Sequence, residues 1–352
     1  MMRFDKYEWT AIFIMVSLFI LVGFVQGWSV SLVILNMCII SAIMTMGVNI
    51  SWGYAGVINF GVMGFLAMGG LAAVLVSYPP VKEAWHVGGS GLGISFILLV
   101  ALVAAVYFIT KLVEKKSHKY WLNGLVIFFG LIIIRYFFLN ATDKIEEVDP
   151  ALAGFLGGAN LPIIFSWAVG GFFAGGVAFV IGKVALGLRS DYLAIVTLGI
   201  SEIVVSVLKH EEWLSRGVKN VIGLKRPVPY EINLQTSDWF INMVTWFNSS
   251  KLNEIIDPNK KQEMLTNLVI DSSSLFVKLN YAVLFFIVMI VIYYFANKAQ
   301  VSPWGRMMRA IRDNEVSANA MGKNIVKQHL IIFVIGAAIV GVAGAMLVTL
   351  DG

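Results

Sequence analysis

The sequence has little charge and almost no cysteine, and both scarcities narrow the class of protein it encodes. Only 13% of its 352 residues are charged and 59% are hydrophobic, whereas about a quarter of a soluble domain is charged. Cys38 is the single cysteine, so a disulfide within the chain is excluded, and the four histidines are too scattered to predict a metal site. The net charge of +5 is distributed over loops between apolar runs and does not predict nucleic-acid binding.

Motifs for catalysis are missing as well. There is no G-x-x-x-x-G-K-[ST] phosphate loop, because the nearest approach, Gly176 to Lys183, has the wrong spacing and lies in an apolar run. Neither an H-E-x-x-H nor a G-x-S-x-G pattern occurs. We therefore expect that the chain is not an enzyme and binds no cofactor or metal of its own. If it pumps a solute, a partner chain must hydrolyse the ATP.

What the sequence does contain is a succession of long apolar runs, with a mean hydropathy of +0.82. Several runs exceed the roughly 20 residues that a helix needs to cross a membrane, and they lack the alternation of barrel strands. The sequence predicts an all-α polytopic membrane protein in which residues 1–352 form a single transmembrane domain. The predicted spans, about nine in number, are 10–26, 28–47, 53–77, 92–113, 120–140, 162–187, 191–208, 278–297 and 328–350.

Charges in the loops predict the topology, since short cytoplasmic loops carry an excess of lysine and arginine. A lysine-rich loop after the fourth span and the basic segment 298–327 are expected in the cytoplasm, and the acidic loop between Asp143 and Asp149 outside. Counting spans from a cytoplasmic N-terminus agrees with all three loops. The long polar segment 209–277 is then extracytoplasmic. The lysines of the first loop are Lys111, Lys115, Lys116 and Lys119.

The segment 53–70, GYAGVINFGVMGFLAMGG, is rich in glycine. Its spacings allow close approach of helix backbones, and they also permit a broken or re-entrant helix that lines protein or a water-filled path. A tightly packed helix pair without a substrate role is the alternative. Asn59 in the middle of the segment favours the lining role, so Asn59, Gly56 and Gly61 are candidates for the substrate path.

Glu202 is the fourth candidate for the substrate path, because it lies near the centre of the predicted span 191–208. A carboxylate at that depth is costly unless it is paired or hydrated, so such an acid is a functional candidate by default. The alternative is a structural hydrogen bond from Glu202 to a neighbouring helix.

The charged segment 302–327 predicts two short helices between two spans. Ser302 before Pro303 is typical of an N-cap followed by proline in the first turn. A second helix is expected from Glu315 to Met321, capped by Asp313 or Asn314 and ended by Gly322. Such helices suit docking on lipid headgroups or on another protein, whereas a basic loop that only fixes orientation is the simpler alternative. The predicted basic docking face consists of Arg306, Arg309 and Arg312.

Several stretches together resemble one family, the permease subunits of bacterial high-affinity branched-chain amino acid ABC importers, of the second-permease type. They are GYAGVINFGVMGF (53–65), LRSDYLAIVTLGISEIV (188–204), WGRMMRAIRDNEVSANAMGKN (304–324) and FVIGAAIVGVAGAML (333–347).

The resemblance implies a multi-pass protein of the bacterial inner membrane that imports branched-chain or related amino acids. Its partners would be a second homologous permease, two cytoplasmic ATP-binding subunits, a periplasmic substrate-binding protein and membrane lipid, but no nucleic acid. ATP would be bound by the partner subunits. By resemblance, the family's coupling helix, which sits in a groove of the ATPase, corresponds to Glu315, Ala318, Ala320, Met321 and Gly322.

The chain departs from the family pattern at Val62, where a histidine is common, at Ser201, where a glycine is common, and at Arg216, the first residue of a usual Gly-Gly pair. The family usually continues past this C-terminus into a further span. Because relatives transport urea or short amides, a urea or amide permease is an alternative. A secondary transporter that relies on Glu202 and a membrane scaffold without a path are the two rivals from other classes.

Overall fold

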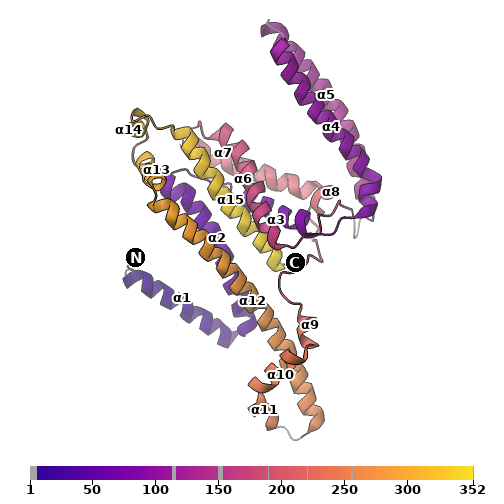
Figure 1. Ribbon diagram of the computed structural model, residues 1–352, viewed down its shortest axis with the longest axis vertical. Coiled ribbons are helices and arrows are strands. Elements are labelled where there is room, and N and C mark those ends of the chain that lie inside the picture. Colours follow the sequence, from indigo (N-terminus) through magenta and orange to yellow (C-terminus); the bar gives the residue numbers. More distant parts are fainter. Residues whose placement is uncertain are drawn as a thin grey trace. The chain divides into compact units, whose positions relative to one another are not determined.

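The protein, described by a computed structural model, is built from helices (Figure 1). The structure describes residues 6–112, 116–149, 154–188, 190–219, 221–254 and 257–351, and no strand occurs among them. The all-α prediction is confirmed. The elements are α1 (Lys6–Val25), α2 (Trp28–Asn49), the π-helix η1 (Ile50–Tyr54), α3 (Val62–Ser77), α4 (Lys82–Leu112), α5 (Lys116–Glu146), α6 (Ile164–Ala185), α7 (Ser190–His210), α8 (Glu212–Ser215), α9 (Glu231–Gln235), α10 (Asp238–Phe247), α11 (Ser249–Asn253), α12 (Pro258–Val301), α13 (Pro303–Asp313), α14 (Glu315–Ala320) and α15 (Ile325–Asp351).

Seven of the described helices are long and apolar enough to cross a membrane: α2 continued by η1, α4, α5, α6, α7, α12 and α15. The apolar parts of α1 and α3 are shorter than 18 residues. The structure therefore does not confirm the predicted count of nine. Two predicted spans account for the difference. The span 53–77 is not one helix from residue 53 onward, which leaves α3 with 16 residues, and the span 10–26 corresponds to the short apolar part of α1, Trp9–Val25.

The chain forms two compact units, which are described separately. The first consists of residues 1–73, 163–202 and 225–352, and the second of residues 74–162 and 203–224. In the first unit α15 packs against α6 and α2, and α12 packs against α2. Gly341 of α15 permits this packing, because a Cβ atom there would overlap the carbonyl oxygen of Gly170 in α6. Small residues thus bring helix backbones together as they do in membrane interiors.

Polar side chains connect the helices of the first unit at a few buried points. The indole Nε1 of Trp167 in α6 donates to Thr349 Oγ1 in α15 at 3.0 Å, and the hydroxyl of Tyr281 in α12 donates to the Thr349 carbonyl at 3.2 Å. Asn36 Nδ2 in α2 donates to the carbonyl of Lys278 in α12 at 3.0 Å. Bonds between helices of this kind fix one helix relative to the next.

The predicted span 278–297 does not begin a helix of its own, because it is the second half of one continuous helix. This helix, α12, has 44 residues and is about 66 Å long at 1.5 Å per residue, twice the roughly 30 Å of a hydrocarbon core. Its more polar first half therefore extends beyond the apolar layer. There α10 packs on it through an edge-to-face contact between Phe240 and Phe276, with ring centroids 5.6 Å apart.

The second unit contains the helix pair α4 and α5 and the short helix α8. The two long helices approach closely at Gly88, where a Cβ atom would overlap the side chain of Ile145. Glu146 Oε1, at the end of α5, accepts a hydrogen bond from the backbone N–H of Trp213 in α8 at 3.2 Å. Lys115, one of the predicted cytoplasmic lysines, lies outside the described residues.

Candidate functional site

The glycine-rich segment is a helix break. The π-helix η1 ends at Tyr54, and the chain is not helical again until Val62. Gly56 has a φ of +70°, which L side chains rarely adopt. Asn59 is buried, with 6% of its surface exposed, and its Oδ1 accepts from the backbone N–H of Gly61 at 2.9 Å. The segment therefore ends η1 with a glycine turn and starts α3 with an asparagine turn.

The start of α3 is held by hydroxyl groups of α7. The backbone N–H of Phe60 donates to Thr197 Oγ1 at 3.2 Å, and that of Gly64 donates to Ser201 Oγ at 2.7 Å. The first N–H groups of a helix have no partner within it, so such acceptors satisfy them. Gly61 is required for the close approach, because a Cβ atom there would lie 2.8 Å from the carbonyl oxygen of Thr197.

Sequence reasoning missed these two hydroxyls as contact residues. Ser201 was visible as a departure from the family pattern, but its bond to Gly64 crosses 137 residues of sequence. Thr197 gave no signal, because a threonine in an apolar run most often bonds its own helix. It does so here too, donating to the carbonyl of Ala194 at 2.9 Å.

Glu202 does not join this buried group. Its neighbour Ser201 is 6% exposed, whereas Glu202 is on the exposed side of α7 together with Ile195 and Leu198. Glu202 has no hydrogen bond or ion pair to another of the described residues. An exposed carboxylate on an otherwise apolar helix face requires water or a further chain beside it.

The charged segment folds as two capped helices, α13 and α14. Ser302 Oγ accepts from the N–H of Gly305 at 3.3 Å, and Asn314 Oδ1 accepts from the N–H of Ser317 at 3.0 Å, so both predicted N-caps are present. Gly322 has a φ of +76° and follows α14, which ends at Ala320, one residue before the predicted Met321. Local capping chemistry therefore determines both helices.

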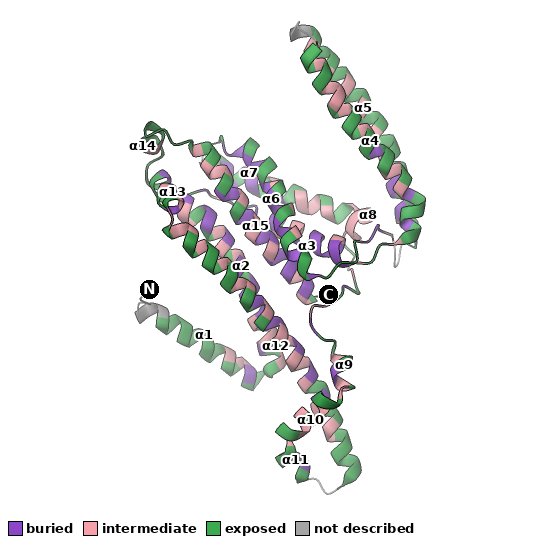
Figure 2. Ribbon diagram, viewed as in Figure 1, coloured by how far each residue is buried: buried purple, intermediate pink, exposed green. Residues whose placement is uncertain are grey.

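The faces of α13 and α14 differ in burial (Figure 2). In α13, Met308 and Ile311 are fully buried, whereas Arg306 and Arg309 are exposed. In α14 only Ala318 is partly buried. The exposed residues of the predicted coupling set are Glu315, Ala320, Met321 and Gly322, and Val316 is exposed beside them. Val316 and Met321 are 82% and 80% exposed, so the tip carries an apolar surface that nothing in the described chain covers.

Arg312 behaves differently from the other two arginines of the predicted basic face. Its Nη1 donates to the carbonyl oxygen of Gly53 at 2.6 Å, and its Nη2 lies 3.2 Å from Asp313 Oδ1. A Cβ atom on Gly56 would lie 3.1 Å from Arg312 Cγ. Arg306 Nη1 instead donates to the carbonyl of Val301, next to its own helix. The structure thus brings Gly56 to the charged segment and Asn59 and Gly61 to α7.

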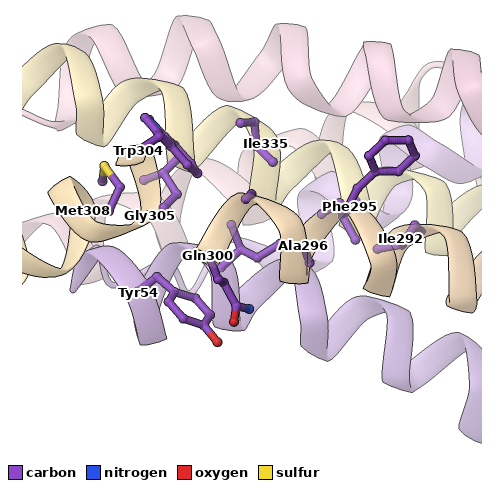
Figure 3. Close-up of a pocket in the computed structure, with 13 residues that line it drawn as sticks. Tyr54, Ile292, Phe295, Ala296, Gln300, Trp304, Gly305, Met308 and Ile335 are labelled. Atoms are coloured by element: carbon purple, nitrogen blue, oxygen red, sulfur yellow. The ribbon is translucent and has the colours of Figure 1, made fainter. Parts of the chain in front are cut away.

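A cavity of about 440 Å³ lies between α12, α13, α15 and η1 (Figure 3). Its walls include Ile50 and Tyr54 of η1, Phe295 of α12 and Met308 of α13. Among the described residues, none with a charged side chain lines it. Because a zwitterionic solute needs polar partners for both of its charges, this cavity is poorly suited to bind one.

Comparisons with known proteins bear on the same part of the chain. Residues 145–351, more than half of the chain, match the family described as "Branched-chain amino acid transport system / permease component". Two relatives are each called "High-affinity branched-chain amino acid transport system permease protein LivM". The protein from Escherichia coli K12 is 27% identical over 186 residues, which is 52% of this chain and 39% of the relative. The protein from Salmonella typhimurium LT2 is 27% identical over 184 residues, again 52% of this chain and 39% of the relative.

The chain therefore matches well under half of the length of these relatives. No solved structure matches it significantly. The family match includes α6, α7 and the whole of α12 to α15, where the candidate residues from Glu202 to Gly322 are found. The chain belongs to the permease-component family of branched-chain amino acid transport systems.

Proposed function

We propose that the chain is a transmembrane permease subunit of an ABC importer for branched-chain or related amino acids. Solute would move inward, driven by ATP that a partner subunit hydrolyses. The observation that carries the proposal is the family match over residues 145–351, which includes both the helix with Thr197 and Ser201 and the helices α13 and α14. The chain belongs to a permease family, and seven of its described helices are long and apolar enough to cross a membrane, so it is a multi-pass membrane protein. In a bacterium this membrane is the inner membrane.

The tip of α14 is the proposed docking site for a cytoplasmic ATP-binding subunit. A helix of six residues is too short to be stable by itself in water, so contacts must hold it. Inside the chain only its side with Ala318 is partly covered, while Val316 and Met321 remain exposed. A groove in a partner that accepts these two side chains would bury them. The exposed guanidinium groups of Arg306 and Arg309 would add electrostatic complementarity to an acidic rim.

The helix break and the exposed face of α7 are proposed to border the solute path. Asn59, Gly56 and Gly61 form irregular backbone, which is tolerated at membrane depth only inside protein or beside water. Glu202 lies on a face that is open in the single chain. A second permease subunit facing α7 would shield this carboxylate from lipid and enclose a polar path between the two chains.

Residues 209–277 are proposed to be extracytoplasmic and to help receive a substrate-binding protein. The segment includes α10, where Trp246 and Phe247 are 72% and 71% exposed, and the polar first part of α12, which begins at Pro258. Single cysteines at Ser250 and Gln262, both exposed, in a Cys38→Ser background should react with an impermeant thiol reagent in intact cells. Protection at both sites until the cells are opened would place the segment in the cytoplasm.

The transport proposal is tested by uptake of radiolabelled leucine in cells that lack the gene and in cells that carry it. Uptake should depend on the gene, be competed by isoleucine and valine, resist a protonophore and stop when ATP is depleted. If urea competes for uptake and valine does not, the transported solutes would be amides and not branched-chain amino acids. Protonophore-sensitive uptake would favour a secondary transporter, and unchanged uptake of every solute would favour a scaffold.

A further inference from the structure

We propose that Arg312 is a positioning residue that connects the coupling helices to the helix break, so that a movement of α14 reaches the backbone beside the solute path directly. The inference rests on the proposed function. The role proposed for Arg312 differs from those of the basic docking face and the coupling helix, which would contact a partner. Arg312 is in this view an internal connector and not a contact for the partner ATPase.

The first support is the bond between Arg312 and Gly53. The last carbonyl groups of a helix lack donors within it, and arginine side chains commonly satisfy them. Arg312 Nη1 does this for η1, at 2.6 Å from the Gly53 carbonyl oxygen. The donor comes from a residue 259 positions away in the sequence, so this bond joins two parts of the chain that are far apart in sequence.

The second support is steric. The side-chain stem of Arg312 lies against Gly56, where a Cβ atom would approach Arg312 Cγ to 3.1 Å. The guanidinium and the stem therefore contact the break at two points, Gly53 before the turn and Gly56 within it. Two contacts from one side chain restrict both the position and the direction of this turn.

The third support is that both partners of this bond are themselves held by further contacts, α13 by the buried core and the end of the helix break by α7. Ile311, next to Arg312, is fully buried in the cluster that also contains Ile50 and Val57, so α13 is fixed to the core beside η1. Beyond the turn, Phe60 and Gly64 are bonded to hydroxyls of α7. A shift of α13 would thus pass through Gly53 to the start of α3 and to α7, in the manner of a small rigid-body movement.

The cavity shown in Figure 3 explains why a polar link is needed at this place. Trp304 and Met308 of α13 and Ile50 and Tyr54 of η1 line its walls, so the two elements leave space between them there. Packing between the two elements is therefore incomplete on that side, and packed side chains transmit displacement only where they touch. The bond from Arg312 crosses between the same two elements.

Arg309 and Asp313 provide matched controls. Arg309 is exposed on the same helix and, in the described part of the chain, has no bond to η1. Asp313 pairs with Arg312 at 3.2 Å, with side chains 41% exposed for Arg312 and 68% for Asp313, and pairs at such exposure contribute little. Asp313→Asn removes the pair and leaves the bond from Arg312 to Gly53.

The experiment has two measurements on the full chain. Hydrogen exchange of the purified protein in nanodiscs should rise roughly fivefold in residues 53–61 for Arg312→Gln, and stay unchanged for Arg309→Gln and Asp313→Asn. ATP hydrolysis of the complex that co-purifies with the tagged chain, stimulated by leucine and periplasmic extract, should fall severalfold for Arg312→Gln at normal ATPase content. It should remain at the unsubstituted level for Asp313→Asn.

Each outcome decides a separate claim. Unchanged exchange in 53–61 for Arg312→Gln would overturn the connection itself, whatever transport does. Raised exchange with undiminished leucine-stimulated hydrolysis would overturn the positioning role and leave the proposed function intact. If the unsubstituted chain brings down no ATPase, the proposed function fails, and the positioning role fails with it. Loss of ATPase content for Arg312→Gln would make Arg312 a docking contact and overturn the proposal.

Discussion

The helices α15 and α4 are almost equally apolar, yet they are used in opposite ways. Their most apolar stretches have mean hydropathies of 2.7 and 2.8, but 56% of the stretch is buried in α15 and only 6% in α4 (Figure 2). Hydropathy therefore indicates whether a helix can enter the membrane. It does not indicate what the helix packs against. In α15, glycine and alanine admit neighbouring backbones, whereas the middle of α4 exposes Phe96, Ile97 and Val100.

The exposed face of α4 and the open face of α7 consequently need different surroundings. Large apolar side chains on α4 are satisfied by lipid tails, which are as apolar as the side chains themselves. The face of α7 carries Glu202 and cannot be satisfied in that way. The presence of a charged side chain on the exposed face thus distinguishes a helix that lipid can cover from one that requires water or a second chain.

The largest difference in stability between variants of the two helices is expected when an aromatic ring is removed. Phe333 in α15 is fully buried and contacts Phe65 edge to face at 5.8 Å between ring centroids. We expect Phe333→Ala to destabilise the protein by about 3–5 kcal/mol. Phe96→Ala in α4, at a ring 67% exposed, should cost less than about 1 kcal/mol. Thermal unfolding in detergent compares the two, and equal losses would remove the distinction between packed and lipid-facing helices.

A smaller effect is expected from adding one methyl group. Gly341→Ala inserts a Cβ atom where the carbonyl of Gly170 already lies, while Gly93→Ala in α4 meets nothing within 4 Å. Overpacking should cost Gly341→Ala about 1–3 kcal/mol, and the control should be neutral or slightly stabilised, since alanine favours helix. Unfolding midpoints of both variants in one detergent measure this. A neutral Gly341→Ala would mean that α6 and α15 are further apart than described.

Two neighbouring residues of α7 give the smallest effect on stability and the sharpest functional contrast. Ser201→Ala removes the acceptor for the buried N–H of Gly64 and should cost about 1–2 kcal/mol. Glu202→Gln, on the exposed side, should leave stability within about 0.5 kcal/mol of the unsubstituted protein yet alter leucine uptake. Unfolding and uptake are measured on both variants. Unaltered uptake kinetics for Glu202→Gln at normal expression would remove Glu202 from the path.

Features that depend on near neighbours in the sequence could be predicted, and features that depend on distant ones could not. The N-caps at Ser302 and Asn314 and the stop at Gly322 follow from chemistry within a few residues, and all three are present. The bonds from Gly64 to Ser201 and from Arg312 to Gly53 join residues 137 and 259 positions apart. No local pattern encodes them, since they arise only when the helices have packed.

The same limit explains why the length of α12 could not be predicted. Residues 258–277 are polar enough to resemble a loop, but a helix can continue through a polar stretch when one side of it packs, as α12 does against α10. Asn36 bonds between two helices, as expected of an amide inside an apolar run, which has few other partners. Which helix would supply the carbonyl could not be derived from the run itself.

The central claim, that α14 docks on a partner ATPase, is tested most directly by one pair of glycine variants. Gly322 and Gly223 have φ values of +76° and +93°, and a Cβ atom on either meets nothing within 4 Å. Valine at each position therefore brings similar backbone strain. The measurement is the ATPase content and the leucine-stimulated ATP hydrolysis of the complex purified through this chain. The account predicts that Gly322→Val loses one or both severalfold while Gly223→Val keeps its ATPase content. Wild-type content and stimulation in Gly322→Val would contradict it and leave the segment as a basic loop that fixes orientation.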